Sequence, residues 1–157
     1  MGAIVTREEA RRVRQEARGQ GRRVVFTNGC FDVLHRGHVE YLQRSRCLGD
    51  LLIVGLNSDA SVLALKGEGR PVLGLEDRAA VLAALACVDY VVVFDEVSVA
   101  DLVADLVPDV LAKGANYTVD QVVGREVVEA AGGRVVVVAS SAPQASTTSR
   151  PTTWSTV

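Results

Sequence analysis

The feature that most constrains the fold is a set of five short apolar runs, rich in valine and without polar alternation. They are RVVFT at 23–27, LLIVGL at 51–56, YVVVF at 90–94, DVLAK at 109–113 and RVVVVA at 134–139. Strands that are buried on both faces have this pattern, and the parallel strands of α/β proteins are buried in this way. The sequence therefore predicts a doubly wound α/β fold, in which a parallel sheet of about five strands carries helices on both faces.

Helical patterns fill the spaces between these runs, at 38–49, 58–65, 75–86, 98–106 and 118–133. A further, strongly polar helix precedes the first run, because Thr6 and Glu9 form a capping box and the glycines at 19 and 21 end the pattern. In such a Rossmann-like arrangement, ligands bind at the carboxyl ends of the strands, where the winding reverses. We therefore expect the functional residues just after the strands, at 28–38, 57–59, 95–96, 113–117 and after Ala139.

The length and composition are those of one ordinary globular domain. The chain has 157 residues, of which 48% are hydrophobic and 23% charged, with a net charge of −2. We expect a single domain over 1–157, with an N-terminal helix over 1–21, a catalytic core over 22–148 and a flexible tail over 149–157. Because it is polar, the N-terminal helix is expected on the outside or against a partner chain.

The charge and the hydropathy pattern indicate neither nucleic acid nor a membrane as a partner. The near-neutral charge gives no basic surface, and no stretch approaches the roughly 20 apolar residues of a membrane span. The N-terminus carries charges where a signal peptide needs an apolar run. The three cysteines, Cys30, Cys47 and Cys87, are an odd number without CxxC spacing, which favours neither a disulfide framework nor a zinc knuckle. We expect a cytoplasmic protein.

Both histidines of the chain, His35 and His38, lie three residues apart in the segment TNGCFDVLHRGH, directly after the first strand. A helix that begins at residue 36 or 37 places both imidazoles on one face of its first turn. The N-terminus of a helix binds anions through free backbone N–H groups, and Gly37 leaves room for a phosphate. The segment therefore predicts a phosphate site, with histidines that only cap the helix, or a zinc site that includes Asp32, as the alternatives.

Of the 17 basic residues only two are lysines, Lys66 and Lys113, and each directly precedes a glycine. In a chain this rich in arginine, a lysine indicates a chemical role, because its compact ammonium differs from a planar guanidinium. Lys66 lies in a glycine-rich loop that could close over the site, although a solvated loop lysine is the alternative. Lys113 ends a strand at the carboxyl edge of the sheet, where Gly114 permits the close approach of a ligand.

NGCFDVLHRGH resembles the (T/N)GxFDxxHxGH signature of the nucleotidyltransferase superfamily that includes glycerol-phosphate, choline-phosphate and heptose-phosphate nucleotidylyltransferases. The similarity continues, in order and spacing, to the D-glycero-β-D-manno-heptose 1-phosphate adenylyltransferases, including the adenylyltransferase half of the bifunctional heptose kinase/adenylyltransferase. It is carried by LGDLLIVGLNSDASVLALKGEGRPV, LEDRAAVLAALACVDYVVVFDE, PDVLAKGANYTVDQVVGREVVEAAGG and STT, and it spans about residues 22–148.

The resemblance implies that AMP passes from ATP to a sugar 1-phosphate, with pyrophosphate as the leaving group and no covalent enzyme intermediate. It implies Mg²⁺ held by the triphosphate rather than by protein ligands, ATP and the sugar 1-phosphate as partners, and a homodimer. His35, His38 and Lys66 are the catalytic residues that it implies, with the histidines donating hydrogen bonds to the phosphates.

The resemblance also implies two sets of binding residues. The nucleotide-binding residues are Thr27, Asn28, Gly29, Cys30, Phe31, Gly37, Lys113, Gly114, Ser146, Thr147 and Thr148. The substrate-binding residues are Asp32, Asn57, Asp59, Arg70 and Arg78.

Several of these assignments have alternatives. Asp32 could orient the loop instead of contacting the sugar, and Arg78 could form a surface salt bridge instead of contacting a phosphate. The segment at 57–59 could serve only to let Ser58 cap a helix. Cys30 is expected to pack rather than to react. Asn116 replaces the aspartate that is usual in the family, and Pro151 interrupts the helix that usually follows STT. The rival activities are transfer from CTP to glycerol 3-phosphate, transfer from ATP to FMN, and a nucleotide-binding module without catalysis.

Overall fold

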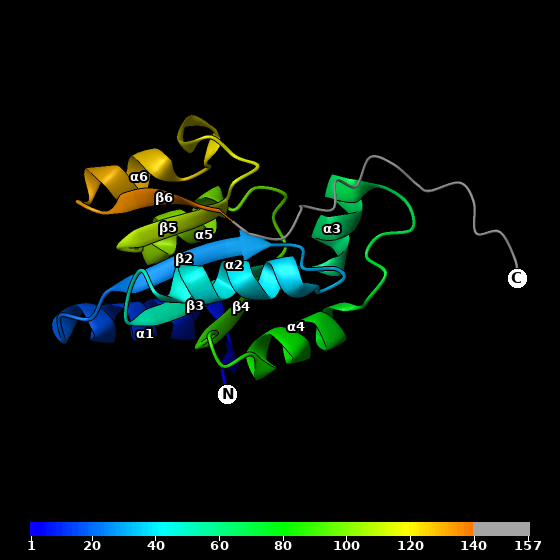
Figure 1. The fold of residues 1–157 in the computed structure, drawn as a ribbon, viewed down its shortest axis with the longest axis horizontal. Coiled ribbons are helices and arrows are strands. Elements are labelled where there is room, and N and C mark those ends of the chain that lie inside the picture. The colour runs from blue at the N-terminus through cyan, green and yellow to red at the C-terminus, as the bar shows by residue number, and fades with distance from the viewer. Residues whose placement is uncertain (140–157) are drawn as a thin grey trace, which may run out of the picture.

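All five apolar runs form strands in the computed structural model, which describes residues 1–139. The strands are β1 (Ala3–Val5), β2 (Val24–Gly29), β3 (Leu51–Asn57), β4 (Tyr90–Phe94), β5 (Val110–Gly114) and β6 (Arg134–Val138). They lie in the order β1-β4-β3-β2-β5-β6, and every neighbouring pair is parallel (Figure 1). The doubly wound α/β prediction is confirmed, with six strands instead of about five.

The additional strand is β1, at the edge of the sheet. It has three residues and pairs with β4, with Ala3 opposite Tyr90. Gly2 allows the chain to enter this edge closely, because a Cβ there would lie 2.5 Å from the carbonyl oxygen of Val88. The prediction missed β1 because three residues are too short to display a burial period.

The helices are α1 (Arg7–Gly19), α2 (Arg36–Arg46), α3 (Asp59–Lys66), α4 (Leu75–Ala84), α5 (Ala100–Leu106) and α6 (Arg125–Ala130), with a 3₁₀ helix, η1 (Val119–Gln121). The predicted capping box of α1 is confirmed, since the Thr6 hydroxyl accepts from the Glu9 amide at 3.2 Å and the Glu9 carboxylate accepts from the Thr6 amide at 2.7 Å. The single helix expected over 118–133 is wrong: it is divided into η1 and α6, because Gly124 takes a positive φ of 89° between them.

Two apolar layers lie on opposite faces of the sheet, because alternate residues of a strand point to opposite sides. Residues such as Phe26 and Ile53 face α1 and α5, whereas their neighbours Val25 and Val54 face α2 and α4. The polar α1 packs on the sheet through a narrow stripe that includes Ala10 and Ala17. None of the helices within residues 1–139 is long and apolar enough to cross a membrane.

The winding reverses between β2 and β5. From β2 the chain proceeds through β3 to β4 on one side, and then crosses to β5 and β6 on the other side. The carboxyl ends of β2 and β5, at Gly29 and Gly114, therefore flank the crevice where an open α/β sheet binds its ligands. The predicted tail at 149–157, with Ser146, Thr147 and Thr148, lies outside the described residues.

Candidate functional site

The two histidines meet at the start of α2. The helix begins at Arg36, as predicted, and His35 is its N-cap. The imidazoles of His35 and His38 stack with their centroids 4.0 Å apart and their planes at 30°. The His35 Nδ1 accepts a hydrogen bond from the Gly37 amide at 3.1 Å, which leaves the proton of the neutral ring on Nε2. His35 is exposed and therefore presents a donor at the mouth of the sheet.

His38 has a drier environment than His35. Burial, and then the charge of His35, lower the pKa of His38 to about 4, so the ring is neutral at pH 7. Its Nδ1 is buried and has no hydrogen-bond partner within residues 1–139. The ring of Phe31, a residue with a φ of 43°, meets His38 edge-on at 5.4 Å. An anion beside this ring would favour its charged, donating form.

Lys113 is a buried cation at the end of β5. It is only 9% exposed, and its Nζ donates to the Asn28 side-chain oxygen at 2.6 Å, across the β2/β5 crevice. Tyr117 places its ring 5.2 Å from the same nitrogen. No carboxylate within residues 1–139 pairs with Lys113, and burial lowers the pKa of its ammonium to about 8. A buried charge without a counter-ion is costly, so this crevice favours an anionic ligand.

Thr27 and Gly29 support the crevice from within the protein. Thr27 is fully buried and its hydroxyl lies 2.6 Å from the Tyr41 hydroxyl, which donates to the Ala112 carbonyl at 3.0 Å. This chain of hydrogen bonds joins β2, α2 and β5, and burial raises the pKa of Tyr41 to about 12. A Cβ at Gly29 would lie 3.1 Å from the Phe31 ring. Tyr41 was missed in the sequence, although a tyrosine on the apolar face of the helix after the signature is a usable signal.

Asp32 is bonded to the loop between α3 and α4. Its carboxylate accepts from the Arg70 guanidinium at 2.6 Å and from the amides of Val72 and Leu73 at 2.6 and 3.0 Å. Burial raises the pKa of Asp32, but these donors outweigh it and the net pKa is lowered. The geometry favours the loop-orienting alternative. It does not support the zinc alternative, since residues 1–139 contain no group of three or more His, Cys, Asp or Glu able to hold a metal.

Arg78 lies in the interior, 1% exposed, so the surface salt bridge considered for it is wrong. Its guanidinium donates to three carbonyls and one carboxylate: Cys30 O at 2.7 Å, Asn57 O at 2.9 Å, Leu73 O at 3.0 Å and Asp59 Oδ1 at 2.6 Å. The second carboxylate oxygen of Asp59 accepts from the Leu75 amide at 3.2 Å.

Asn57 and Ser58 are occupied locally at the start of α3. The buried Asn57 side chain donates to the Ser61 hydroxyl at 2.9 Å, and Ser58 caps α3 by accepting from the Ser61 amide at 3.3 Å. The capping alternative for Ser58 is confirmed, and a sugar contact by Asn57 or Asp59 stays a prediction.

Lys66 is the last residue of α3 and is exposed. Gly67 and Gly69 follow it with φ values of 86° and 80°. Within residues 1–139, Lys66 has no ion pair or hydrogen bond from its side chain. Its charge, with those of Arg78 and Lys113, acts on the half-buried Cys30, but burial dominates and raises the pKa of that thiol. A raised pKa agrees with a packing role for Cys30.

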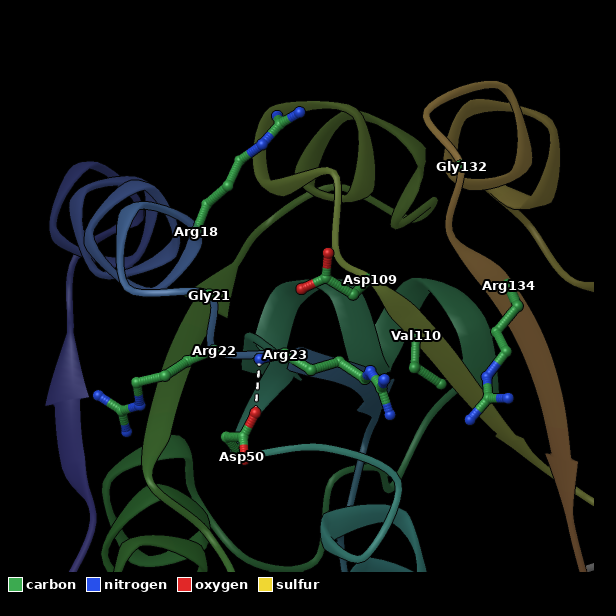
Figure 2. A pocket seen from close by; sticks show the side chains of 9 residues that line it. All are labelled: Arg18, Gly21, Arg22, Arg23, Asp50, Asp109, Val110, Gly132 and Arg134. Atoms are coloured by element: carbon green, nitrogen blue, oxygen red, sulfur yellow. Dashed lines mark hydrogen bonds between the residues drawn. The ribbon is translucent and has the colours of Figure 1, made fainter.

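A second feature lies at the opposite end of the sheet (Figure 2). A hollow of about 440 Å³ opens at the amino ends of β2, β5 and β6, where none of the predicted site residues lies. Its lining residues are Arg18, Gly21, Arg22, Arg23, Asp50, Asp109, Val110, Gly132 and Arg134. Both carboxylates are bonded to the chain: Asp50 accepts from the Arg23 amide at 2.7 Å, and Asp109 from the Val24 amide and from Arg14 at 2.8 and 2.9 Å.

Comparison with known proteins identifies relatives for most of the chain. It is 65% identical over 122 residues to the bifunctional protein HldE of Geobacter sulfurreducens, which covers 78% of this chain and 25% of that protein. It is 56% identical over 135 residues to the bifunctional protein HldE of Syntrophotalea carbinolica, and this match covers 86% of this chain and 28% of that protein. The chain thus spans about a quarter of the length of these curated relatives.

Solved structures share the fold. The lipopolysaccharide core biosynthesis protein of Thermoplasma volcanium matches with a TM-score of 0.62 and 29% identity, over 77% of this chain and 98% of that one. Pantothenate synthetase of Thermus thermophilus, at 19% identity, covers 88% of this chain and 61% of that one with a TM-score of 0.59, and supports the fold alone. The cytidylyltransferase-like family model matches residues 26–156, which include the histidine signature, Lys66 and Lys113. The chain therefore belongs to the cytidylyltransferase-like family.

Proposed function

We propose that the chain transfers AMP from ATP to a sugar 1-phosphate, specifically D-glycero-β-D-manno-heptose 1-phosphate, and releases pyrophosphate. The observation that carries this proposal is the combination of the stacked His35/His38 pair at the start of α2 with Lys113, a buried ammonium that lacks a carboxylate partner within residues 1–139. Such a group of donors fits the phosphates of a nucleotide at the β2/β5 crevice.

In this reaction, the residues of the site position the two substrates and stabilise the negative charge of the phosphates. An oxygen of the sugar phosphate attacks the α-phosphorus of ATP, and the bond to the pyrophosphate breaks as the new P–O bond forms. The attacking phosphate is already an anion, so no side chain has to remove a proton from it. In this proposal the exposed His35 Nε2–H meets the triphosphate at the start of α2, and Lys113 meets it at the end of β5.

His38 and Lys66 complete the cationic side of the site in this proposal. His38 is neutral in the free protein because of its low pKa, and the approach of the triphosphate favours its protonated form. Lys66 lies at the exposed end of α3 and reaches the leaving pyrophosphate across the crevice. Negative charge that develops on the leaving group is therefore met by donors from three separate elements.

We propose that ATP enters as its Mg²⁺ complex. The carboxylate of Asp32 is bonded to the loop, and residues 1–139 contain no group of three or more His, Cys, Asp or Glu that could hold a metal ion. The triphosphate oxygens are then the metal ligands, and Mg²⁺ offsets part of their charge.

The identity of the sugar is supported by the relatives. The chain is 65% identical to an HldE protein and shares its fold with a protein described by its role in lipopolysaccharide core biosynthesis. Together with the sequence resemblance to heptose 1-phosphate adenylyltransferases, these similarities favour the heptose over glycerol 3-phosphate or FMN. Four further points belong to this proposal. They are a homodimer, a cytoplasmic location, a single-domain organisation, and a contact between the triphosphate and Ser146, Thr147 and Thr148.

A pyrophosphate-release assay tests the proposal. The protein is incubated with Mg²⁺, heptose 1-phosphate and each nucleoside triphosphate in turn, and the same set is repeated with glycerol 3-phosphate and with FMN. We expect release with ATP and heptose 1-phosphate, and ADP-heptose as the second product. Release with CTP alone would overturn the adenylyl assignment, release with another acceptor would overturn the heptose, and no release at all would favour a binding module.

A further inference from the structure

The segment from Asp59 to Leu75 leaves the sheet after β3 and returns at α4, and it carries Lys66 near its middle. In Figure 1 its first half, α3, lies at the carboxyl end of the sheet, and the connecting loop arches from it to α4. The start of α3 packs against β3, since Ser61 and Val62 are buried and Ser61 accepts from the Asn57 side chain. We call residues 59–75 the Lys66 excursion. We propose that Asp32 and Arg78 are positioning residues that clamp this excursion to the histidine segment, and thereby hold Lys66 in reach of the phosphates. This inference rests on the proposed function for the role of Lys66.

Arg78 closes the base of the excursion. Its guanidinium binds Asp59 at the first residue, at 2.6 Å, and the Leu73 carbonyl near the end, at 3.0 Å. The same group binds the carbonyls of Asn57, at the end of β3, and Cys30, in the histidine segment, at 2.9 and 2.7 Å. One buried side chain thus gathers both ends of the excursion and both neighbouring strand ends. Only a forked guanidinium has the donors for four acceptors in different directions.

Asp32 holds the returning half of the excursion from the other side. It lies in the histidine segment, three residues before His35, and binds Arg70 together with the amides of Val72 and Leu73. The side chains of Val72 and Leu73 are 63% and 39% exposed, so few apolar contacts hold this part of the loop. The carboxylate therefore anchors this part of the loop together with Arg78, since hydrogen bonds to a charged group are stronger than neutral ones.

The tip of the excursion contrasts with its clamped base. Lys66, Gly67 and Gly69 are exposed, and a Cβ at either glycine would contact nothing within 4 Å. The tip is thus free to adjust to a ligand, whereas the base fixes where the tip starts and ends. The clamp limits the range of positions that the Lys66 ammonium can occupy. This matters for turnover, because a small displacement of a catalytic group lowers the rate by a large factor.

Amide hydrogen exchange tests the clamp without reference to activity. In the wild-type protein we expect the amides of Val72 and Leu73 to be protected despite their exposed side chains, because they donate to Asp32. In Asp32→Ala their exchange should accelerate about tenfold or more, while β2 and β3 remain protected. Arg70→Ala, which removes only a partly exposed partner, keeps the test available if Asp32→Ala fails to fold.

Arg125→Ala is the matched control, because it breaks ion pairs to Asp120 in η1 and Glu129 on α6, and Arg125 forms no ion pair or side-chain hydrogen bond with the excursion. Val72 and Leu73 should exchange in this variant as in the wild type. Unprotected amides in the wild type, or equal exchange in Asp32→Ala, Arg70→Ala and the control, would overturn the clamp whether or not the protein transfers nucleotides.

A double-mutant cycle tests whether the clamp acts through Lys66. Arg70→Ala should lower kcat about tenfold while the KM for the sugar phosphate stays within about twofold, as expected for a misplaced catalytic group. In a Lys66→Ala background the same change should cost less than about twofold, because there is no lysine left to position.

The other outcomes separate the two proposals. If the two changes multiply, and if the KM for the sugar phosphate rises, Arg70 contacts the substrate directly and the positioning role is overturned. If exchange accelerates but kcat is unchanged in Arg70→Ala, the clamp exists without a role in turnover, and the inference fails. If Lys66→Ala is itself fully active, the proposed role of Lys66 fails, whereas the exchange rates still decide the clamp.

Discussion

Both ends of the sheet gather cations, but they do so in different ways. At the carboxyl end, Lys113 is buried with only neutral partners within residues 1–139, and the two stacked histidines lie at the same end of the sheet. At the amino end, a hollow is lined by Arg18, Arg22, Arg23 and Arg134, with two aspartates among them (Figure 2). All four arginines are exposed, so water solvates their charges.

The difference teaches that the cost of burying a charge indicates a ligand better than the presence of a hollow does. An exposed guanidinium costs almost nothing and requires no partner. A buried ammonium without a counter-ion reduces the stability of the free protein, and the anion that we propose beside it would offset this cost. We therefore expect substitutions at the two ends to differ sharply in their effects on turnover.

The largest effect is expected for His38→Ala. Removal of one donor to the transition state should lower kcat about 10²-fold or more, while the fold survives. Steady-state pyrophosphate release measures the rate, and circular dichroism checks the fold. A loss of less than about threefold in a folded variant would contradict a role for this imidazole.

Lys113→Met should reduce turnover and raise thermal stability at the same time. Loss of the ammonium removes a phosphate donor, and we expect at least about a tenfold decrease in kcat/KM for ATP. The same change removes a buried charge whose pKa is lowered to about 8 by burial, so Tm at pH 7 should rise. Calorimetry measures the expected rise in Tm, and steady-state kinetics on the same sample measure the expected fall in kcat/KM for ATP. A lower Tm would show that Lys113 is mainly structural.

Lys66→Arg should also impair turnover, by several-fold, although the charge is retained. A rigid planar fork on the exposed end of α3 cannot follow a moving phosphate as a lysine does. Wild-type kinetics in this variant would return Lys66 to the solvated-loop alternative. Lys66→Ala serves as the reference for complete loss of the charge.

The pH dependence of stability should report His38. Because its pKa is about 4 in the folded protein and about 6.5 in the unfolded chain, the unfolded state binds more protons between these values. The free energy of unfolding should therefore decrease as the pH falls from about 6.5 towards 4. Urea unfolding at a series of pH values measures this slope. His38→Gln should show a shallower slope, and equal slopes would contradict the low pKa.

The smallest effects are expected at the amino end. Arg23→Ala and Arg134→Ala each remove an exposed guanidinium from the hollow, far along the strands from the histidines. Each should change kcat and KM by less than about twofold, as is usual for surface positions. A loss comparable to that of Lys113→Met would break the comparison and show that the hollow participates in turnover.

The fold and the position of the histidines at the start of α2 could be predicted because both depend on local pattern. Apolar runs marked β2 to β6, and the histidine spacing marked the first turn of α2. The bonds of Arg78 could not be predicted. Its acceptors at Cys30 and Asn57 are 48 and 21 residues away, and nothing local distinguishes a guanidinium that binds carbonyls from one that binds a phosphate. Asp32 was ambiguous for the same reason, since its partners depend on where the loop returns.

Arg78 also links the assembly of the site to the folding of the whole chain. Its four acceptors come together only after β2, β3 and α4 have docked, so a partly folded intermediate cannot contain a formed nucleotide crevice. Contacts between residues this far apart in sequence carry a larger loop-closure entropy cost than local contacts do. The molecule therefore gains its binding capacity cooperatively, and a bound nucleotide would in turn favour the fully folded state by mass action.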